Sequence, residues 1–294
     1  AMIEFLDEES VVYERDIVED EVKGPLSPVG LYQLFLFSTL HFVLAAIIVQ
    51  FLMNLQNVII LKMYYFNLLY TPLGVKFLYS DVSKWTIPKI FEVYGLIPLA
   101  FFVIGILMVW ILRKRKLGYW KLRLLLTWMA FIFVHTLPVG LIAGTLIFDG
   151  FGIAHQWLIQ DITIRIGAAL AIIAVVRMYR SLWQTLFLKA AYAGVFVSDY
   201  TNRRTYLRNA FVRPWYIGCL LLFPFAWKAH SIYWLAFLLG LGIVVMPLSS
   251  LSVPSINLAV AKSKGKIWPF RYPLAFLIII LLALWWLCNT SIVL

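Results

Sequence analysis

Charged residues are scarce in this chain, and cysteines are scarcer still. Of its 294 residues, 13% are charged and 63% are hydrophobic, whereas a soluble domain is about one quarter charged and about half apolar. A mean hydropathy of +0.90 exceeds what one water-soluble core can hide, so we predict a protein that crosses a membrane several times. Because the apolar runs are about 20 residues long, the expected fold is an all-α, polytopic transmembrane helical bundle.

Sequence motifs of catalysis are also missing. The chain contains no His-Glu-x-x-His, Gly-x-Ser-x-Gly, P-loop or Cys-x-x-Cys motif. Its two cysteines, Cys219 and Cys288, lie in apolar stretches, which is typical of small core residues and argues against a disulfide or metal clip. The sequence therefore favours a non-enzymatic protein, although an enzyme is left open, and it indicates no cofactor.

We expect about seven spans, within a range of six to eight. Residues 214–227 are the shortest candidate, and they need completion by residues before Arg213 unless they form a re-entrant loop. Residues 181–198 are apolar too, but we interpret them as an extension of the fourth helix or as an interfacial helix. The expected spans are 31–53, 93–112, 124–148, 160–179, 214–227, 232–250 and 272–294.

The net charge of +11 hides a strong asymmetry. Residues 1–29 carry nine acids and two bases, and the remainder carries five acids and 23 bases. With the N-terminus in the cytoplasm, the connections 113–123, 177–213 and 251–271 carry 17 bases, against six on the outer side. This positive-inside pattern predicts a multi-pass protein of the plasma (inner) membrane. The bases then serve orientation and contact with anionic lipid at the cytoplasmic face, not nucleic acid.

Two parts differ in character. Residues 1–29 form an acidic cytoplasmic tail, and residues 30–294 form the transmembrane domain, with an outer interfacial segment rich in Tyr and Lys at about 54–92. The acids within residues 1–22 predict docking onto the basic loops or onto a partner subunit. The alternative is a solvated tail.

Two histidines lie deep inside predicted spans. His41 and His135 are about ten residues from the inner face, near the bilayer centre, where an ionisable ring is costly unless it finds a partner. Together with Thr136 they form a candidate intramembrane polar site. The two rings could hold a metal, a haem or a shuttled proton, or each could be a structural residue satisfied by its own neighbours.

Small residues predict close helix packing in two spans. Gly140 and Gly144 form a Gly-x-x-x-Gly pair, and Gly167 with Ala171 repeats this spacing in the next span. Pro138 predicts a kink in the first of these helices.

Titratable residues gather at the turn that follows the third span. Asp149, His155, Asp161 and Arg165 occur within one stretch, and Asp161 and Arg165 are spaced to pair on one helix face. We predict this stretch as a candidate outer-face site. The alternative is a capped, solvated helix connection.

These observations favour a non-enzymatic subunit of a membrane complex or a small permease. The alternative is a membrane-embedded enzyme or redox subunit that uses His41 and His135 to hold a metal or haem.

Overall fold

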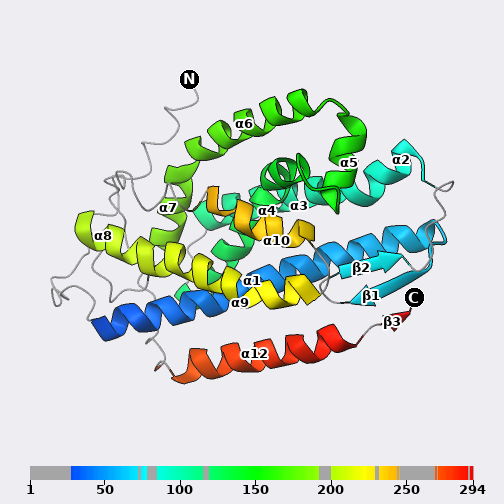
Figure 1. Ribbon diagram of the computed structural model, residues 1–294. Coiled ribbons are helices and arrows are strands. Elements are labelled where there is room, and N and C mark those ends of the chain that lie inside the picture. Colours follow the sequence, from blue (N-terminus) through cyan, green and yellow to red (C-terminus); the bar gives the residue numbers. More distant parts are fainter. Residues whose placement is uncertain are drawn as a thin grey trace.

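The computed structural model shows a bundle of helices with a small sheet at one end (Figure 1). It describes residues 28–71, 74–77, 85–114, 119–191, 200–228, 232–243, 245, 269, 271–290 and 292–293. The predicted all-α bundle is confirmed. The acidic tail predicted for residues 1–29 lies outside the described residues except for its last two, which begin the first helix.

The helices follow one another along the chain with short connections. The first half contains α1 (Pro28–Met63), α2 (Ile87–Ile90), the π-helix η3 (Phe91–Gly95), α3 (Leu96–Lys114), α4 (Trp120–Gly144) and α5 (Phe151–Leu158). The second half contains α6 (Ile162–Met178), α7 (Arg180–Lys189), α8 (Tyr200–Leu207), the π-helix η4 (Arg208–Val212), α9 (Arg213–Lys228), α10 (Ile232–Gly240) and α12 (Arg271–Asn289).

Among the residues that the structure describes, five helical segments are long and apolar enough to cross a bilayer, so the chain has the character of an integral membrane protein. A sixth crossing results if α6 and α7, which meet at an angle of 42°, form one bent span. Seven crossings stay a prediction, because the expected span at 232–250 is described only in part. The five segments are Gly30–Met63, Ile87–Lys114, Trp120–Gly144, Thr201–Lys228 and Arg271–Asn289.

The structure describes the two segments for which the sequence left alternatives open. The short candidate at 214–227 is completed upstream, because α8 and η4 continue without a break into α9. Within 181–198, α7 follows α6 after the bend and buries Trp183, Leu186 and Phe187 in the core, as expected of an extension of the fourth helix, while the interfacial alternative stays a prediction. Residues 192–198 lie outside the described residues.

Aromatic side chains form the centre of the bundle. The ring of Trp128 on α4 lies 4.9 Å from Phe42 of α1, 4.8 Å from Phe187 of α7 and 5.1 Å from Phe211 of η4, measured between centroids. Its indole N–H donates to the Ser38 hydroxyl at 3.0 Å, and that hydroxyl donates to the Ala210 carbonyl within η4. A π-helix shifts the backbone hydrogen bonds by one residue, so Ser38 supplies a partner where the helix pattern changes.

A small antiparallel sheet covers one end of the bundle. It consists of β1 (Leu68–Thr71), β2 (Gly74–Phe77) and β3 (Ile292–Val293), in the order β2-β1-β3. The predicted outer segment at 54–92 therefore begins with the last turns of α1 and then contains two strands, which the sequence analysis did not expect.

The described acidic residues lie at one end of the bundle, together with bases such as Lys89, Arg165 and Lys228, whereas the other end carries bases without a described acid. We call the end where α3 ends and α4 begins the basic end, because it carries Arg113, Lys114, Lys121 and Arg123. The opposite end, where α4 meets α5, is the acidic end. The described acidic residues Glu92, Asp149 and Asp161 lie there.

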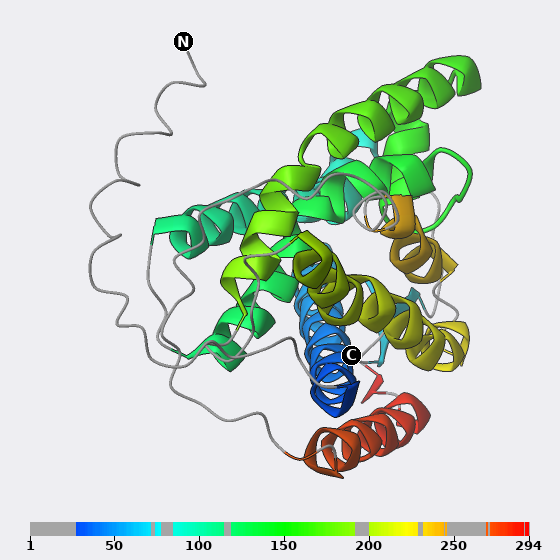
Figure 2. The same ribbon diagram turned by 90° about the vertical axis from the view of Figure 1, so that its left-hand side faces the viewer.

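Two helices lie at opposite edges of the bundle. In both views α6 runs along one edge and α12 along the other, with α1, α4 and α9 between them (Figures 1 and 2). Most of the surface of α12 and α6 is exposed and apolar, as expected of helices that face lipid or another membrane helix.

Candidate functional site

The turn between α4 and α5 ends with an Asp-Gly pair that fixes its geometry. Asp149 Oδ1 accepts a hydrogen bond from the backbone N–H of Gly150 at 2.8 Å, and its Oδ2 accepts one from the backbone N–H of Tyr233 at 3.2 Å. Gly150 has a φ of +52°, a conformation that favours glycine. The carboxylate therefore joins the turn to the start of α10.

His155 and Arg165 lie against the last turn of α4. His155 is 3% exposed, and an added Cβ on Gly144 would lie 3.3 Å from its Nδ1. Arg165 is 9% exposed and donates from Nη1 to the Thr145 carbonyl at 3.4 Å. Burial lowers the pKa of His155, and the positive charge of Arg165 lowers it further, so the ring is neutral at pH 7.

Asp161 has a local role in the structure. It is the N-cap residue of α6, and its Oδ1 accepts a hydrogen bond from the Thr163 N–H at 2.7 Å. This bond lowers the pKa of Asp161, and Arg165 contributes only the smallest part. The guanidinium of Arg165 turns toward α4 instead, so the capping bond dominates over the ion pair predicted from their spacing.

Two tyrosines at this end were missed by the sequence analysis. Tyr233 is buried, and its hydroxyl has no hydrogen-bond partner within the described residues. Tyr94 of η3 and Tyr233 both lie close enough to Asp149 for its negative charge to act on their hydroxyl groups. Both tyrosines are far from Asp149 in the sequence and lie inside apolar stretches, so no sequence pattern indicated that they lie near it. We call Asp149, His155, Asp161, Arg165 and these two tyrosines the acidic-end cluster.

The acidic-end cluster mainly holds helices together. Asp149 joins the α4–α5 turn to α10, and Arg165 joins α6 to α4. Some hydrogen-bonding capacity is unused among the described residues: both ring nitrogens of His155, Nε of Arg165 and the hydroxyl of Tyr233 have no partner. The hydrogen bonds of Asp149 and Arg165 go to backbone groups, so chemically this arrangement can orient a polar group.

The two intramembrane histidines have separate surroundings. His41 donates from Nδ1 to the Phe37 carbonyl at 2.7 Å, and its ring lies 4.3 Å from that of Phe37. His135 donates to the Phe131 carbonyl at 2.6 Å and lies between Phe131 and Trp183, with centroids at 4.5 and 5.3 Å. These hydrogen bonds and ring contacts of His41 and His135 involve different residues, so they do not bring the pair together.

Thr136, the third residue of the predicted intramembrane site, belongs to a helix interface. Its hydroxyl lies 3.0 Å from the Pro98 carbonyl of α3 and 2.7 Å from the Phe133 carbonyl of α4. Among the described residues, no group of three or more His, Cys, Asp and Glu side chains could hold a metal ion.

The two small-residue pairs have different environments. An added Cβ at Gly140 would lie 2.6 Å from the Tyr233 hydroxyl, and one at Gly144 would lie 2.9 Å from the Cα of Gly152. At Gly167 no atom of the described residues lies within 4 Å of the added Cβ, and Ala171 is exposed as well. The described part of the chain therefore fills the face of α4 but leaves that of α6 open.

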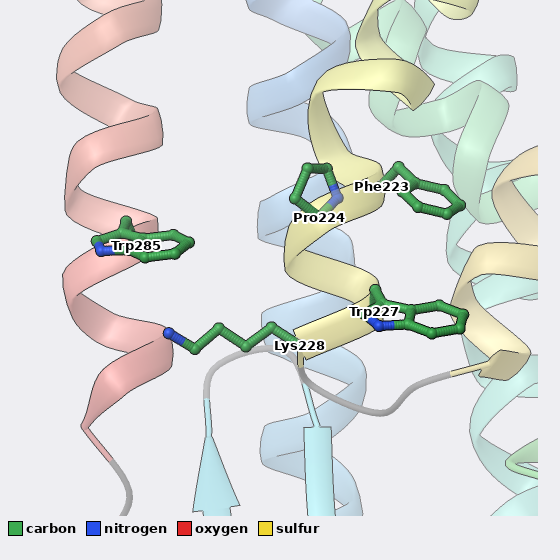
Figure 3. A pocket seen from close by; sticks show the side chains of 5 residues that line it. All are labelled: Phe223, Pro224, Trp227, Lys228 and Trp285. Carbon is green, nitrogen blue, oxygen red and sulfur yellow. The ribbon is translucent and has the colours of Figure 1, made fainter.

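Two open grooves border α12. One, of about 450 Å³, is lined by Phe223, Pro224, Trp227, Lys228 and Trp285 (Figure 3). Lys228 reaches from α9 toward α12, where its Nζ lies 4.1 Å from the Trp285 ring centroid and donates to Asn289. The other groove, of about 350 Å³, lies between α1, β1 and α12 and is lined almost entirely by apolar side chains. Such surfaces suit lipid chains better than a polar solute.

Comparison with known proteins gives no relative from which a role could be inferred. No protein-family model matches the chain, and no curated protein or solved structure does either.

Proposed function

We propose that this protein is a non-catalytic subunit of a membrane complex, and that it packs a transmembrane helix of a partner against α6. The observation that carries this proposal is the open strip of small residues on α6. Gly167, Ala171 and Ala174 are exposed, and none of the atoms in the described ranges lies within 4 Å of a Cβ added at Gly167.

The geometry of α6 separates its two sides. A helix turns by about 100° per residue, so the buried residues Arg165, Ala169 and Val176 share one face, which packs toward α4 and α7. Gly167, Ala171 and Ala174 lie on the opposite face. Membrane helices associate through such small residues because their backbones can then approach closely.

A comparison with α12 makes the case stronger. The exposed face of α12 carries bulky side chains, such as Ile279, Leu282 and Trp286, as expected of a surface in contact with lipid. The helix α6 also exposes bulky side chains, such as Leu170 and Met178, but they border the small residues of the strip. Glycine in a helix costs about 1 kcal/mol relative to alanine in soluble helices, and on a lipid-facing surface it brings no packing in return. The strip on α6 is therefore better explained by a helix that covers it.

The setting of this proposal is the plasma membrane, with the basic end in the cytoplasm. The positive charge of the basic end and the acidic residues of the opposite end support this orientation. The predicted acidic segment 1–22 would then lie on the cytoplasmic side, where it could add a second contact to a partner subunit.

Replacement of Gly167 by Leu tests the proposal. Native purification in mild detergent should recover a stoichiometric partner with the wild-type chain and with Gly167→Ala, whose methyl group keeps the strip narrow. Gly167→Leu should lose that partner, whereas Leu282→Ala on α12 should retain it. Equal recovery with Gly167→Leu would contradict the proposal, and substrate uptake into vesicles by the purified chain alone would favour a permease.

A further inference from the structure

A buried arginine marks the basic end. Arg123 lies in the first turn of α4 and is 5% exposed. Its NH2 group donates to the Leu112 carbonyl at 2.9 Å, which joins α4 to the end of α3. Its Nε–H has no acceptor within the described residues. Because a buried guanidinium is costly without full hydrogen bonding, this group has unused capacity for an anion.

Two further cations come from neighbouring helices. Lys189, the last residue of α7, is half-buried and lies close enough to Arg123 and Arg113 to be repelled by both. Arg113 is in the last turn of α3. Three helices thus bring three positive charges to one place, which we call the basic cluster.

No described acid compensates this charge. Glu92, Asp149 and Asp161 are the acidic residues within the described ranges, and all three lie at the acidic end. Like charges that meet without an anion oppose folding, and the repulsion is stronger where the surroundings are apolar. The basic cluster therefore has the composition of an anion-binding site.

We propose that the basic cluster of Arg113, Arg123 and Lys189 binds the headgroup phosphate of an anionic lipid. Guanidinium groups suit phosphate oxygens because their N–H donors form a planar fork. This site is separate from the strip on α6 and does not depend on the proposed function.

The depth of the basic cluster favours lipid over a soluble anion. Trp110 and Tyr119 flank it on α3 and just before α4, and they are 56% and 72% exposed. Lys114 lies over the Trp110 ring, with Nζ 4.8 Å from its centroid. Exposed Trp and Tyr with nearby Lys are typical of the membrane–water interface, the level at which lipid phosphates lie.

Native mass spectrometry of the full chain in detergent tests this site, with phosphatidylglycerol as the anionic probe and phosphatidylcholine as the zwitterionic control. The wild-type chain should retain phosphatidylglycerol in preference to phosphatidylcholine. Arg123→Gln or Lys189→Gln should reduce this retention by about tenfold, the equivalent of one charge-assisted hydrogen bond. Arg271→Gln, at the exposed start of α12, is the matched control and should retain the lipid.

Several results would overturn the proposal. Unchanged retention by Lys189→Gln would do so, and this half-buried position keeps the test valid even if Arg123→Gln fails to fold. Displacement of the lipid by inorganic phosphate at equal concentration would identify a site for soluble phosphate instead. Retention that appears only after deletion of residues 2–22 would show that the acidic tail occupies the basic cluster.

Discussion

The same spacing of small residues has opposite environments on α4 and α6. On α4, Gly140 lies against Tyr233 of α10 and Gly144 lies against Gly152 of α5. On α6, Gly167 and Ala171 face outward. The comparison teaches that a small-residue pattern predicts close helix packing but does not reveal whether the partner helix belongs to the same chain. On α6, the absence of a neighbour within the described residues makes a second chain the better explanation.

The largest expected effect is a difference in stability between a Gly144 variant and a Gly167 variant. Gly144→Leu should lower the free energy of unfolding by about 3 kcal/mol, because the side chain would overlap Gly152 and His155. Gly167→Leu should not destabilise the protein, and it should raise the free energy of unfolding slightly, because glycine costs about 1 kcal/mol relative to alanine in a helix and the described residues leave room at this position. Denaturant unfolding in detergent, followed by tryptophan fluorescence, measures both values. Equal destabilisation by the two variants would show that the α6 face is packed within the chain.

Replacement of Arg165 tests the contact between the buried face of α6 and α4. Arg165→Leu should destabilise the protein by about 1 kcal/mol, because it removes the long hydrogen bond from the guanidinium to the Thr145 carbonyl. The exposed Arg177 on the same helix is the control, and Arg177→Leu should have a smaller effect. The same unfolding assay applies. If both variants behave alike, Arg165 does not hold α6 against α4.

The pH dependence of stability tests the environment of His155. Its pKa is lowered in the folded state, so the unfolded state binds more protons once the pH falls below the ordinary value of 6.5. Stability should therefore decrease from pH 7 to pH 5, and His155→Asn should make this decrease smaller. Thermal unfolding at a series of pH values measures it. An identical profile in the variant would mean that the ring is not buried as described.

Asp161 should have the smallest effect, since its side chain is fully exposed. Its pKa lies below the ordinary 3.8, so the charged carboxylate contributes stability above that pH and loses the contribution as the pH falls through the lowered pKa. Asp161→Asn keeps an N-cap acceptor but removes the titration. The variant should therefore show a flatter stability profile below pH 4. A steeper profile would contradict the capping role.

The hydropathy of the sequence predicted the helical bundle well. Most of the residues at the acidic end were predicted as a candidate site because they occur close together in the sequence. The upstream completion of α9 was one of two alternatives, because only packing shows where a helix with several arginines continues. Pairing of β1 with β3 joins residues 69–70 to residues 292–293, and no local signal encodes that contact. Tyr233 and Lys189 were missed for the same reason, because each acquires its neighbours only when distant helices meet.

A photo-reactive residue at position 171 tests the central claim most directly, with position 282 on α12 as the lipid-facing control. After irradiation of intact membranes, position 171 should form one discrete protein crosslink whose mass is constant between preparations, and position 282 should react with lipid. The crosslink should disappear when Gly167 is also replaced by Leu. Reaction with lipid alone at both positions would contradict the account, because the open face of α6 would then be an ordinary membrane surface.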